Sequence, residues 1–249
     1  MKQPRYSWEA RIERASQLQK EHAAASELLG FYAGLLRLQK SLFEEVAATS
    51  SAEVAPLAAH APELLQLVER TAPAAMAALA RDLHHADWSA RLASAWTAQL
   101  NGLEREPDFF SSALLQPYAE ALAWETVPLE GARCPFCQAP PMLAVMRPEG
   151  EGARRFLYCG TCGTEWPYRR LKCVHCGEED KEKLPDFKSE KTKHIYLAAC
   201  ESCHHTLKAI DLSVDGLAIP AVDDIASVSL SLWGQQQGYQ PVQPNLFGF

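Results

Sequence analysis

The chain has 249 residues, of which 47% are apolar and 22% charged, and its formal net charge is −7. This length suits one or two globular domains with buried cores. Residues 1–127 carry 11 basic and 16 acidic side chains, and residues 128–249 carry 13 and 15. Because neither half is basic, a broad surface for nucleic-acid phosphates is disfavoured.

No apolar run approaches the ~18 residues that a membrane-spanning helix needs, and the start of the chain lacks the hydrophobic region of a signal peptide. We therefore expect a cytoplasmic protein. In that compartment, paired cysteines more often bind metals or serve redox chemistry than form structural disulfides.

The first half of the chain is rich in helix-forming residues and has no cysteine. Its apolar periodicity and capping signals, which include Ser7 and Asp108, predict an all-α bundle of five to six helices. The expected helices span residues 7–21, about 28–43, 63–70, 74–85, 88–100 and 108–124, with a loop between Pro56 and Pro62. Gly30 and Gly34 indicate either a weaker helix or close helix packing.

Histidine and tryptophan side chains in this half are candidates for a site. His84 and His85 stand beside Asp87, but no further carboxylate or histidine at helical spacing completes a metal or acid–base site. We interpret them as surface groups. Trp88, Trp96 and Trp124 are expected to be core or interface anchors, which makes the bundle a scaffold or docking surface.

All eight cysteines of the chain fall into four Cys-x-x-Cys pairs. The first two pairs follow the pattern C-x2-C-x21-C-x2-C and the last two C-x2-C-x23-C-x2-C, and each pattern can build a tetrahedral four-thiolate shell for zinc or iron. The expected ligands are Cys134, Cys137, Cys159 and Cys162 in a first site, and Cys173, Cys176, Cys200 and Cys203 in a second.

Strand and turn patterns surround these pairs, after a linker expected at residues 126–131. Residues 142–146 and 154–158 predict two strands joined by a turn at 148–152. Cys173 lies 39 residues after Cys134, and Cys200 lies 41 after Cys159, which indicates two copies of one unit. A positive φ is expected for three glycines next to the cysteines, namely Gly160, Gly163 and Gly177.

Other uses of the cysteines fit less well. No βαβ pattern surrounds any pair, as a thioredoxin-like dithiol would require. Cys200, Cys203 and His204 match a haem-attachment pattern, but the other three pairs lack the histidine. His175 and His205 are alternative ligands, although eight thiolates already fill two sites. Filled shells leave no open catalytic position, so we expect a structural or electron-exchanging metal module and not an enzyme.

Six segments carry a more specific pattern than the cysteine spacing alone. They are residues 155–166 (RFLYCGTCGTEW), 170–176, 201–208, 222–230, 238–239 and 245–247. Together they resemble the FdhE-type accessory proteins of formate dehydrogenase, over about 115 residues from Cys134 onwards. The resemblance implies a cytoplasmic helper that binds the catalytic molybdenum/selenium or tungsten subunit of respiratory formate dehydrogenase before export. It also implies rubredoxin-like sites associated with iron, although tetrahedral sulfur ligands accept zinc as well.

We therefore expect an α+β fold with four parts. These are a helical domain (1–127), two tandem rubredoxin-like, zinc-ribbon-like β modules (128–170 and 171–221) and a C-terminal helix from Val222 to about Gln237 within residues 222–249. The partner is expected to dock between the modules on Trp166, Tyr168, Arg169 and Arg170. The alternative for the two aromatic residues is that they pack one module against the other.

Two other functions remain open at this stage. The first is a thiol–disulfide or electron-transfer protein that acts on a client enzyme. The second is a nucleic-acid-binding zinc-ribbon protein.

Overall fold

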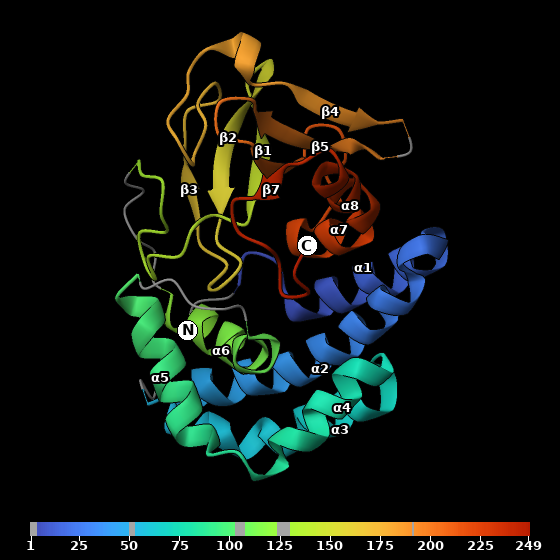
Figure 1. Ribbon diagram of the computed structural model, residues 1–249, viewed down its shortest axis with the longest axis vertical. Coiled ribbons are helices and arrows are strands. Elements are labelled where there is room, and N and C mark those ends of the chain that lie inside the picture. Colours follow the sequence, from blue (N-terminus) through green and yellow to red (C-terminus); the bar gives the residue numbers. More distant parts are fainter. Residues whose placement is uncertain (1–3, 50–52, 103–107, 124–129, 191) are drawn as a thin grey trace.

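A helical part lies at one end of the molecule and a β-sheet at the other, with two short helices between them (Figure 1). The structure is a computed structural model and describes residues 4–49, 53–102, 108–123, 130–190 and 192–249. The arrangement confirms the expected α+β fold class. None of the helices in these ranges is long and apolar enough to cross a membrane.

The helical part contains six α-helices within the described ranges. They are α1 (Trp8–Glu21), α2 (Ser26–Thr49), α3 (Ala61–Thr71), α4 (Ala74–Asp82), α5 (Trp88–Leu100) and α6 (Phe109–Leu122). Short 3₁₀ turns are η1 (Ala23–Ala25), η2 (Ala55–His60) and η3 (Leu83–His85). The side chains of Ser7 and Asp108 cap α1 and α6, accepting hydrogen bonds from the backbone N–H of Ala10 and Phe110.

Two helical predictions need correction. The stretch between Pro56 and Pro62 is not a loop: it forms η2, which runs directly into α3. Both prolines lie in the first turn of their element, where a missing N–H costs no hydrogen bond. The helix predicted to reach residue 85 ends at Asp82 and continues as η3.

Helix α2 is the centre of the helical part and contacts α1, α3 and α6. Its two glycines stand where neighbouring side chains approach. A Cβ at Gly30 would lie 2.6 Å from Gln19 Nε2, and one at Gly34 would lie 3.3 Å from Leu67 Cδ1. The glycines therefore mark close helix packing.

The second half of the chain forms a seven-stranded sheet. Its strands are β1 (Leu143–Glu149), β2 (Gly152–Tyr158), β3 (Glu165–Pro167), β4 (Asp186–Ser189), β5 (Thr192–Cys200), β6 (His205–Asp211) and β7 (Gln240–Pro241). Their order is β3-β2-β1-β6-β5-β4, with β7 beside β6. A 3₁₀ turn, η4 (Lys181–Lys183), precedes β4.

The two β modules are joined in this one sheet. Strand β1 of the first pairs in parallel with β6 of the second, from Leu143 opposite Lys208 to Met146 opposite Asp211. The other neighbours from β3 to β4 are antiparallel. The modules therefore share backbone hydrogen bonds, and the division of the chain at residues 127, 170 and 221 stays a prediction.

Two local details also differ from the sequence prediction. The β1–β2 hairpin is longer than expected, because its turn contains only Gly150, with a φ of 58°, and Glu151. The expected C-terminal helix is two helices, α7 (Pro220–Ala226) and α8 (Val228–Gln236). They are separated at Ser227, whose hydroxyl donates to the carbonyl oxygen of Asp223 or Asp224.

Candidate metal centres

All four Cys-x-x-Cys pairs adopt the same backbone turn. In each, the residue after the second cysteine donates its N–H to the carbonyl of the first cysteine, at 2.8–3.1 Å. That residue has a positive φ in every case: Gln138 (61°), Gly163 (66°), Gly177 (81°) and His204 (55°). The repeated sequence pattern thus corresponds to a repeated conformation.

This geometry corrects the expectation for the glycines. Gly163 and Gly177 have the expected positive φ, whereas Gly160 does not. A Cβ at Gly160 would lie 2.5 Å from Met142 Sδ, so that glycine is needed for close approach. Sequence reasoning missed Gln138 and His204, because side chains other than glycine seldom adopt this conformation.

The eight sulfurs gather in two groups. The first centre contains Cys134, Cys137, Cys159 and Cys162, and the second centre contains Cys173, Cys176, Cys200 and Cys203. Sulfur pairs across each centre are 3.4 and 3.6 Å apart in the first and 3.6 and 3.7 Å apart in the second. A tetrahedral ion with metal–sulfur bonds of about 2.3 Å has sulfur–sulfur edges of about 3.8 Å. Both groups therefore fit a four-thiolate metal centre, and all eight thiols are free.

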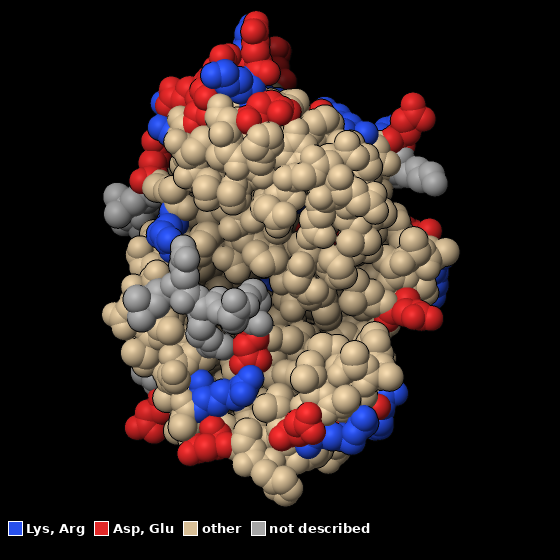
Figure 2. Space-filling view, viewed as in Figure 1, with Lys and Arg blue, Asp and Glu red and all other residues tan. Residues whose placement is uncertain are grey.

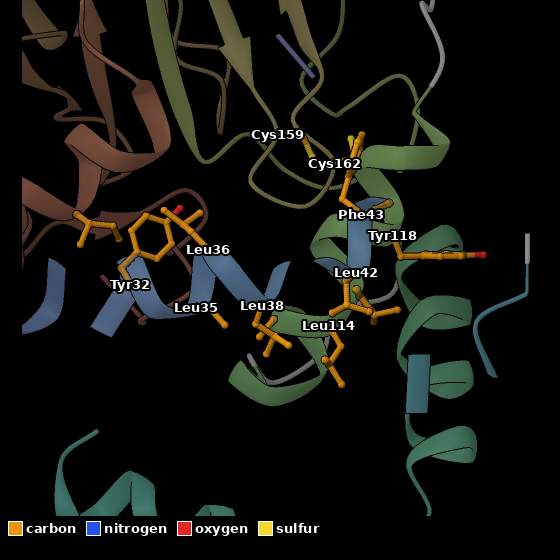
Figure 3. Close-up of a cluster of buried hydrophobic side chains, with 14 of the residues drawn as sticks. Tyr32, Leu35, Leu36, Leu38, Leu42, Phe43, Leu114, Tyr118, Cys159 and Cys162 are labelled. Atoms are coloured by element: carbon orange, nitrogen blue, oxygen red, sulfur yellow. The ribbon is translucent and has the colours of Figure 1, made fainter. Parts of the chain in front are cut away.

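The first centre is part of the main hydrophobic core. Its four cysteines are exposed by at most 1%, and Cys159 and Cys162 belong to the same buried cluster as Phe43 and Tyr118 of the helical part (Figure 3). Burial raises the pKa of the Cys159 and Cys162 thiols well above the ordinary value. A cation is therefore needed to hold these sulfurs as thiolates, which is what a bound metal supplies.

Two glutamines of the helical part hold the backbone of the first centre. Gln99 Nε2 in α5 donates to the Cys137 carbonyl at 3.1 Å, and Gln116 Nε2 in α6 donates to the Gly160 carbonyl at 2.9 Å. Nothing in the sequence singles out these glutamines. They connect the helices directly to two of the cysteine turns.

The second centre is open to solvent on one side. Cys200 is 1% exposed and Cys173 8%, but Cys203 is half-buried and Cys176 exposed. None of these cysteines belongs to the hydrophobic core clusters of the described residues. Burial still raises the pKa of the Cys200 and Cys203 thiols.

The four residues expected to bind a partner lie in different environments. Trp166 is fully buried, and its indole N–H donates to the Gly131 carbonyl at 2.8 Å. Tyr168 is half-buried, with its hydroxyl 3.4 Å from the Cys173 carbonyl and its ring below the Arg155 guanidinium. Only Arg169 and Arg170 are exposed. Trp166 is therefore an interior residue, and Tyr168 packs against the cysteine turn of the second module.

The candidate histidines of the helical part form no site with Asp87. His84 pairs with Glu69, and Asp87 caps α5 by accepting a hydrogen bond from the Ala90 N–H. No metal-binding group among the described residues contains any of these side chains. Trp88 and Trp96 are buried, whereas Trp124 and most of the expected linker at 126–131 lie outside the described residues.

A buried polar network that sequence reasoning missed connects the two parts of the molecule. Arg14 Nη2 of α1 lies 2.6 Å from Asp223 Oδ1 of α7 and 3.0 Å from Asp215 Oδ2. His194 Nε2 of β5 lies 3.0 Å from the same Asp223 oxygen. His194, Asp215 and Asp223 have the spacing of a metal site, but Arg14 already provides their positive charge. In the sequence, two adjacent aspartates within the apolar run from residue 218 to 226 could have indicated this network.

The surface charge of one face agrees with the acidic composition. Figure 2 shows acidic and basic side chains together near the two ends of this face, with a largely uncharged middle. No continuous basic patch is visible among the described residues on this side. This face therefore lacks the usual charge pattern of a nucleic-acid-binding surface.

Comparison with known proteins gives consistent matches. Sequence models named "FdhE, central domain" and "FdhE, C-terminal domain" match residues 133–170 and 171–247. An FdhE homolog of Aquifex aeolicus is 40% identical over 57% of this chain and 52% of the relative. One of Pseudomonas aeruginosa is 31% identical over 95% of this chain and 88% of the relative.

A solved structure gives the same result. The crystal structure of the FdhE protein from Pseudomonas aeruginosa matches with a TM-score of 0.70 and 28% identity, over 96% of this chain and 94% of that one. In contrast, the chain spans about half of the Aquifex aeolicus relative and 37% of one from Stutzerimonas stutzeri. With its helices, shared sheet and two four-cysteine groups, this chain belongs to the FdhE family.

Proposed function

We propose that this chain is a cytoplasmic accessory protein of respiratory formate dehydrogenase, which holds one metal ion in each cysteine centre and binds the catalytic subunit before export. The observation that carries the proposal is the pair of four-cysteine groups, built into one sheet in a member of this family. Four thiolates fill a tetrahedral shell and leave no position for a substrate. A role in binding and maturation therefore fits these centres better than a catalytic role.

The eight cysteines are the proposed ligands, with iron as the expected metal and zinc as the alternative. The test is metal analysis of freshly purified protein, together with its visible spectrum before and after dithionite. Two irons per chain and a red colour that bleaches on reduction are expected. Two zincs and no colour would leave the centres structural, while four disulfides and no metal would overturn the proposal.

The openness of the second centre supports a second candidate function, electron exchange with the client enzyme. Cys176 is exposed, so a partner can approach one ligand of this centre closely. An iron centre can transfer a single electron, whereas zinc has no redox chemistry. The bleaching experiment therefore also tests this candidate, because colourless two-zinc protein would rule it out.

The proposed docking surface is the short exposed segment of Arg169, Arg170 and Leu171 between the two cysteine centres. Leu171 is 56% exposed, so an apolar side chain stands next to the two arginines at the surface. Among the described residues, Arg169 pairs with the exposed Glu179, at 2.7 Å, and such a surface pair is easily exchanged for another. Arg170 lines a cavity of about 80 Å³ beside Cys173 and Cys200. A client bound here would touch the second centre.

Charge reversal tests this surface. Arg169→Glu combined with Arg170→Glu should abolish co-purification with the formate dehydrogenase catalytic subunit and leave the metal content unchanged. Arg70→Glu combined with Arg81→Glu is the matched control, because these arginines are also exposed but lie on the helical part. Equal capture by the two double variants would remove the docking surface from the proposal.

A further inference from the structure

The two centres differ at two matched positions of the repeat. Phe136 and His175 each stand two residues after the first cysteine of their centre, and Thr164 and His205 each stand two residues after the last. In the first centre, Phe136 packs against the core, and Thr164 Oγ1 lies 3.1 Å from Cys162 Sγ. In the second centre, both positions are histidines. The repeat therefore places two additional metal-binding side chains at the second centre only.

The fold brings these histidines together. The rings of His175 and His205 are parallel within 9°, and their centroids are 3.6 Å apart. One nitrogen of each ring and the sulfur of Cys203 all lie within 4.8 Å of one another. Three donors that zinc-class ions accept thus converge beside the second centre.

One histidine is held in a single tautomer by the backbone. His205 Nδ1 lies 2.8 Å from the Cys203 carbonyl oxygen, which is a hydrogen bond that Nδ1–H donates. The proton on Nδ1 leaves the lone pair of Nε2 free. A ring held by a backbone carbonyl in this way is the usual arrangement of a metal-binding histidine.

The group faces solvent: His175 is exposed, and His205 and Cys203 are half-buried. We propose that His175, His205 and Cys203 bind a further divalent cation of the zinc class at the exposed rim of the second centre, where Cys203 is shared with the ion of that centre. The exposed His175 ring turns out of the stack to aim its nitrogen at the ion. Cys203 is already a thiolate because it binds the ion of that centre, so its sulfur shares a further lone pair with the added cation and releases no proton.

A shared thiolate gives the second centre a way to exchange its metal ion, which the first centre lacks. An ion held at the rim reaches the other three cysteines without leaving Cys203. The first centre has a phenylalanine and a threonine in the same places and is closed to solvent. The inference rests on the proposed function only in requiring that the second centre holds a metal.

The test is a cobalt titration of protein that carries two zinc ions, without oxygen. Zinc resists displacement by cobalt at thiolate sites, so cobalt reports additional sites. One cobalt per chain is expected beyond the two zincs, with the near-ultraviolet absorption of a cobalt–thiolate bond. The variant His175→Phe combined with His205→Thr carries the residues of the first centre. It should lose that cobalt and keep both zincs and the melting temperature.

The control is His84→Phe combined with His85→Thr, which makes the same changes at neighbouring histidines of the helical part. It should bind the additional cobalt as the unchanged protein does. The rim site is overturned if the two-zinc protein binds no further cobalt, if the His175/His205 variant still binds it, or if the control also loses it. Protein whose two cysteine centres hold fewer than two metal ions, iron and zinc counted together, would contradict both this site and the proposed function.

Discussion

The two cysteine centres share one backbone turn and one ligand set, yet their surroundings are opposite. The first is enclosed by α5, α6 and the main core, and the second has solvent on one side. The cysteine spacing therefore determines only which four sulfurs can coordinate each ion. The neighbouring residues decide whether a centre holds the fold together or stays accessible to ions and partners.

The largest difference is expected between matched cysteine variants. Cys159→Ser removes a buried ligand of the first centre and should lower the free energy of unfolding by about 4–5 kcal/mol, because metal and core packing are lost together. Cys176→Ser removes an exposed ligand of the second centre and should cost about 2 kcal/mol or less. Urea unfolding with metal analysis measures both. Equal losses of unfolding free energy in the two variants would contradict the difference between the two centres.

A change outside both centres serves as a reference. Asp223→Asn breaks the buried network with Arg14 and His194 and should cost about 3 kcal/mol, since it leaves the Arg14 charge incompletely paired. Both metals should remain bound, because no cysteine contacts this network in the described structure. Loss of one metal in this variant would show that the network supports that centre specifically.

The same variant has a defined pH dependence. Burial alone would raise the pKa of Asp223, but hydrogen bonds from His194 and Arg14 hold it below the ordinary value of 3.8. The carboxylate therefore stabilises the fold above that pH, and this contribution is lost as the pH falls through the lowered pKa. The unfolding free energy of Asp223→Asn should fall less steeply than that of the unchanged protein below about pH 4. Parallel curves would contradict this role of Asp223.

The two centres should differ in the rate at which a chelator removes their metal ions. The second centre should lose its metal to an excess of a coloured chelator at least about tenfold faster than the first, corresponding to about 1.4 kcal/mol in barrier height. Its exposed Cys176 can be displaced without unfolding, whereas the first centre must open its core. A single release rate for both ions would contradict the difference in access.

The smallest effect concerns the glycines of the cysteine turns. Gly163→Ala and Gly177→Ala each force alanine into a left-handed conformation and should each cost about 1 kcal/mol. Gly163→Ala should cost more, because its Cβ would lie 3.1 Å from Glu120 Oε1, while the nearest atom at Gly177 is 4.0 Å away. Thermal unfolding of the two variants measures the difference. The reverse order would show that the first centre is less tightly packed than its burial indicates.

The sequence predicted those features that short segments determine. The cysteine groups, the caps at Ser7 and Asp108 and the span of α5 follow from local spacing and local hydrogen bonds. Trp166 was expected to bind the partner or to pack one module against the other, and the structure shows its side chain buried on β3, which pairs with β2. Gln99 and Gln116 could not be found, because a helical glutamine gives no local signal of what it contacts.

The pairing of β1 with β6 was also beyond the sequence pattern. Residues 143–146 of β1 are a continuous apolar run that is buried on both faces of the strand, and such a run predicts a buried strand but not its neighbour. The break between the two C-terminal helices at Ser227 could not be predicted for a related reason. Apolar residues continue on both sides of it, and at this residue both the backbone N–H and the hydroxyl bond to the carbonyls of Asp223 and Asp224.

The β1–β6 pairing has a consequence for biosynthesis. A ribosome releases β1 long before β6, so the nascent first module has an unpaired strand edge while the second is still being made. Such edges recruit other chains, and closing a contact between distant segments is slow. A fragment ending after residue 170 would keep that edge permanently. The two halves that the family models divide should therefore be produced together as one chain.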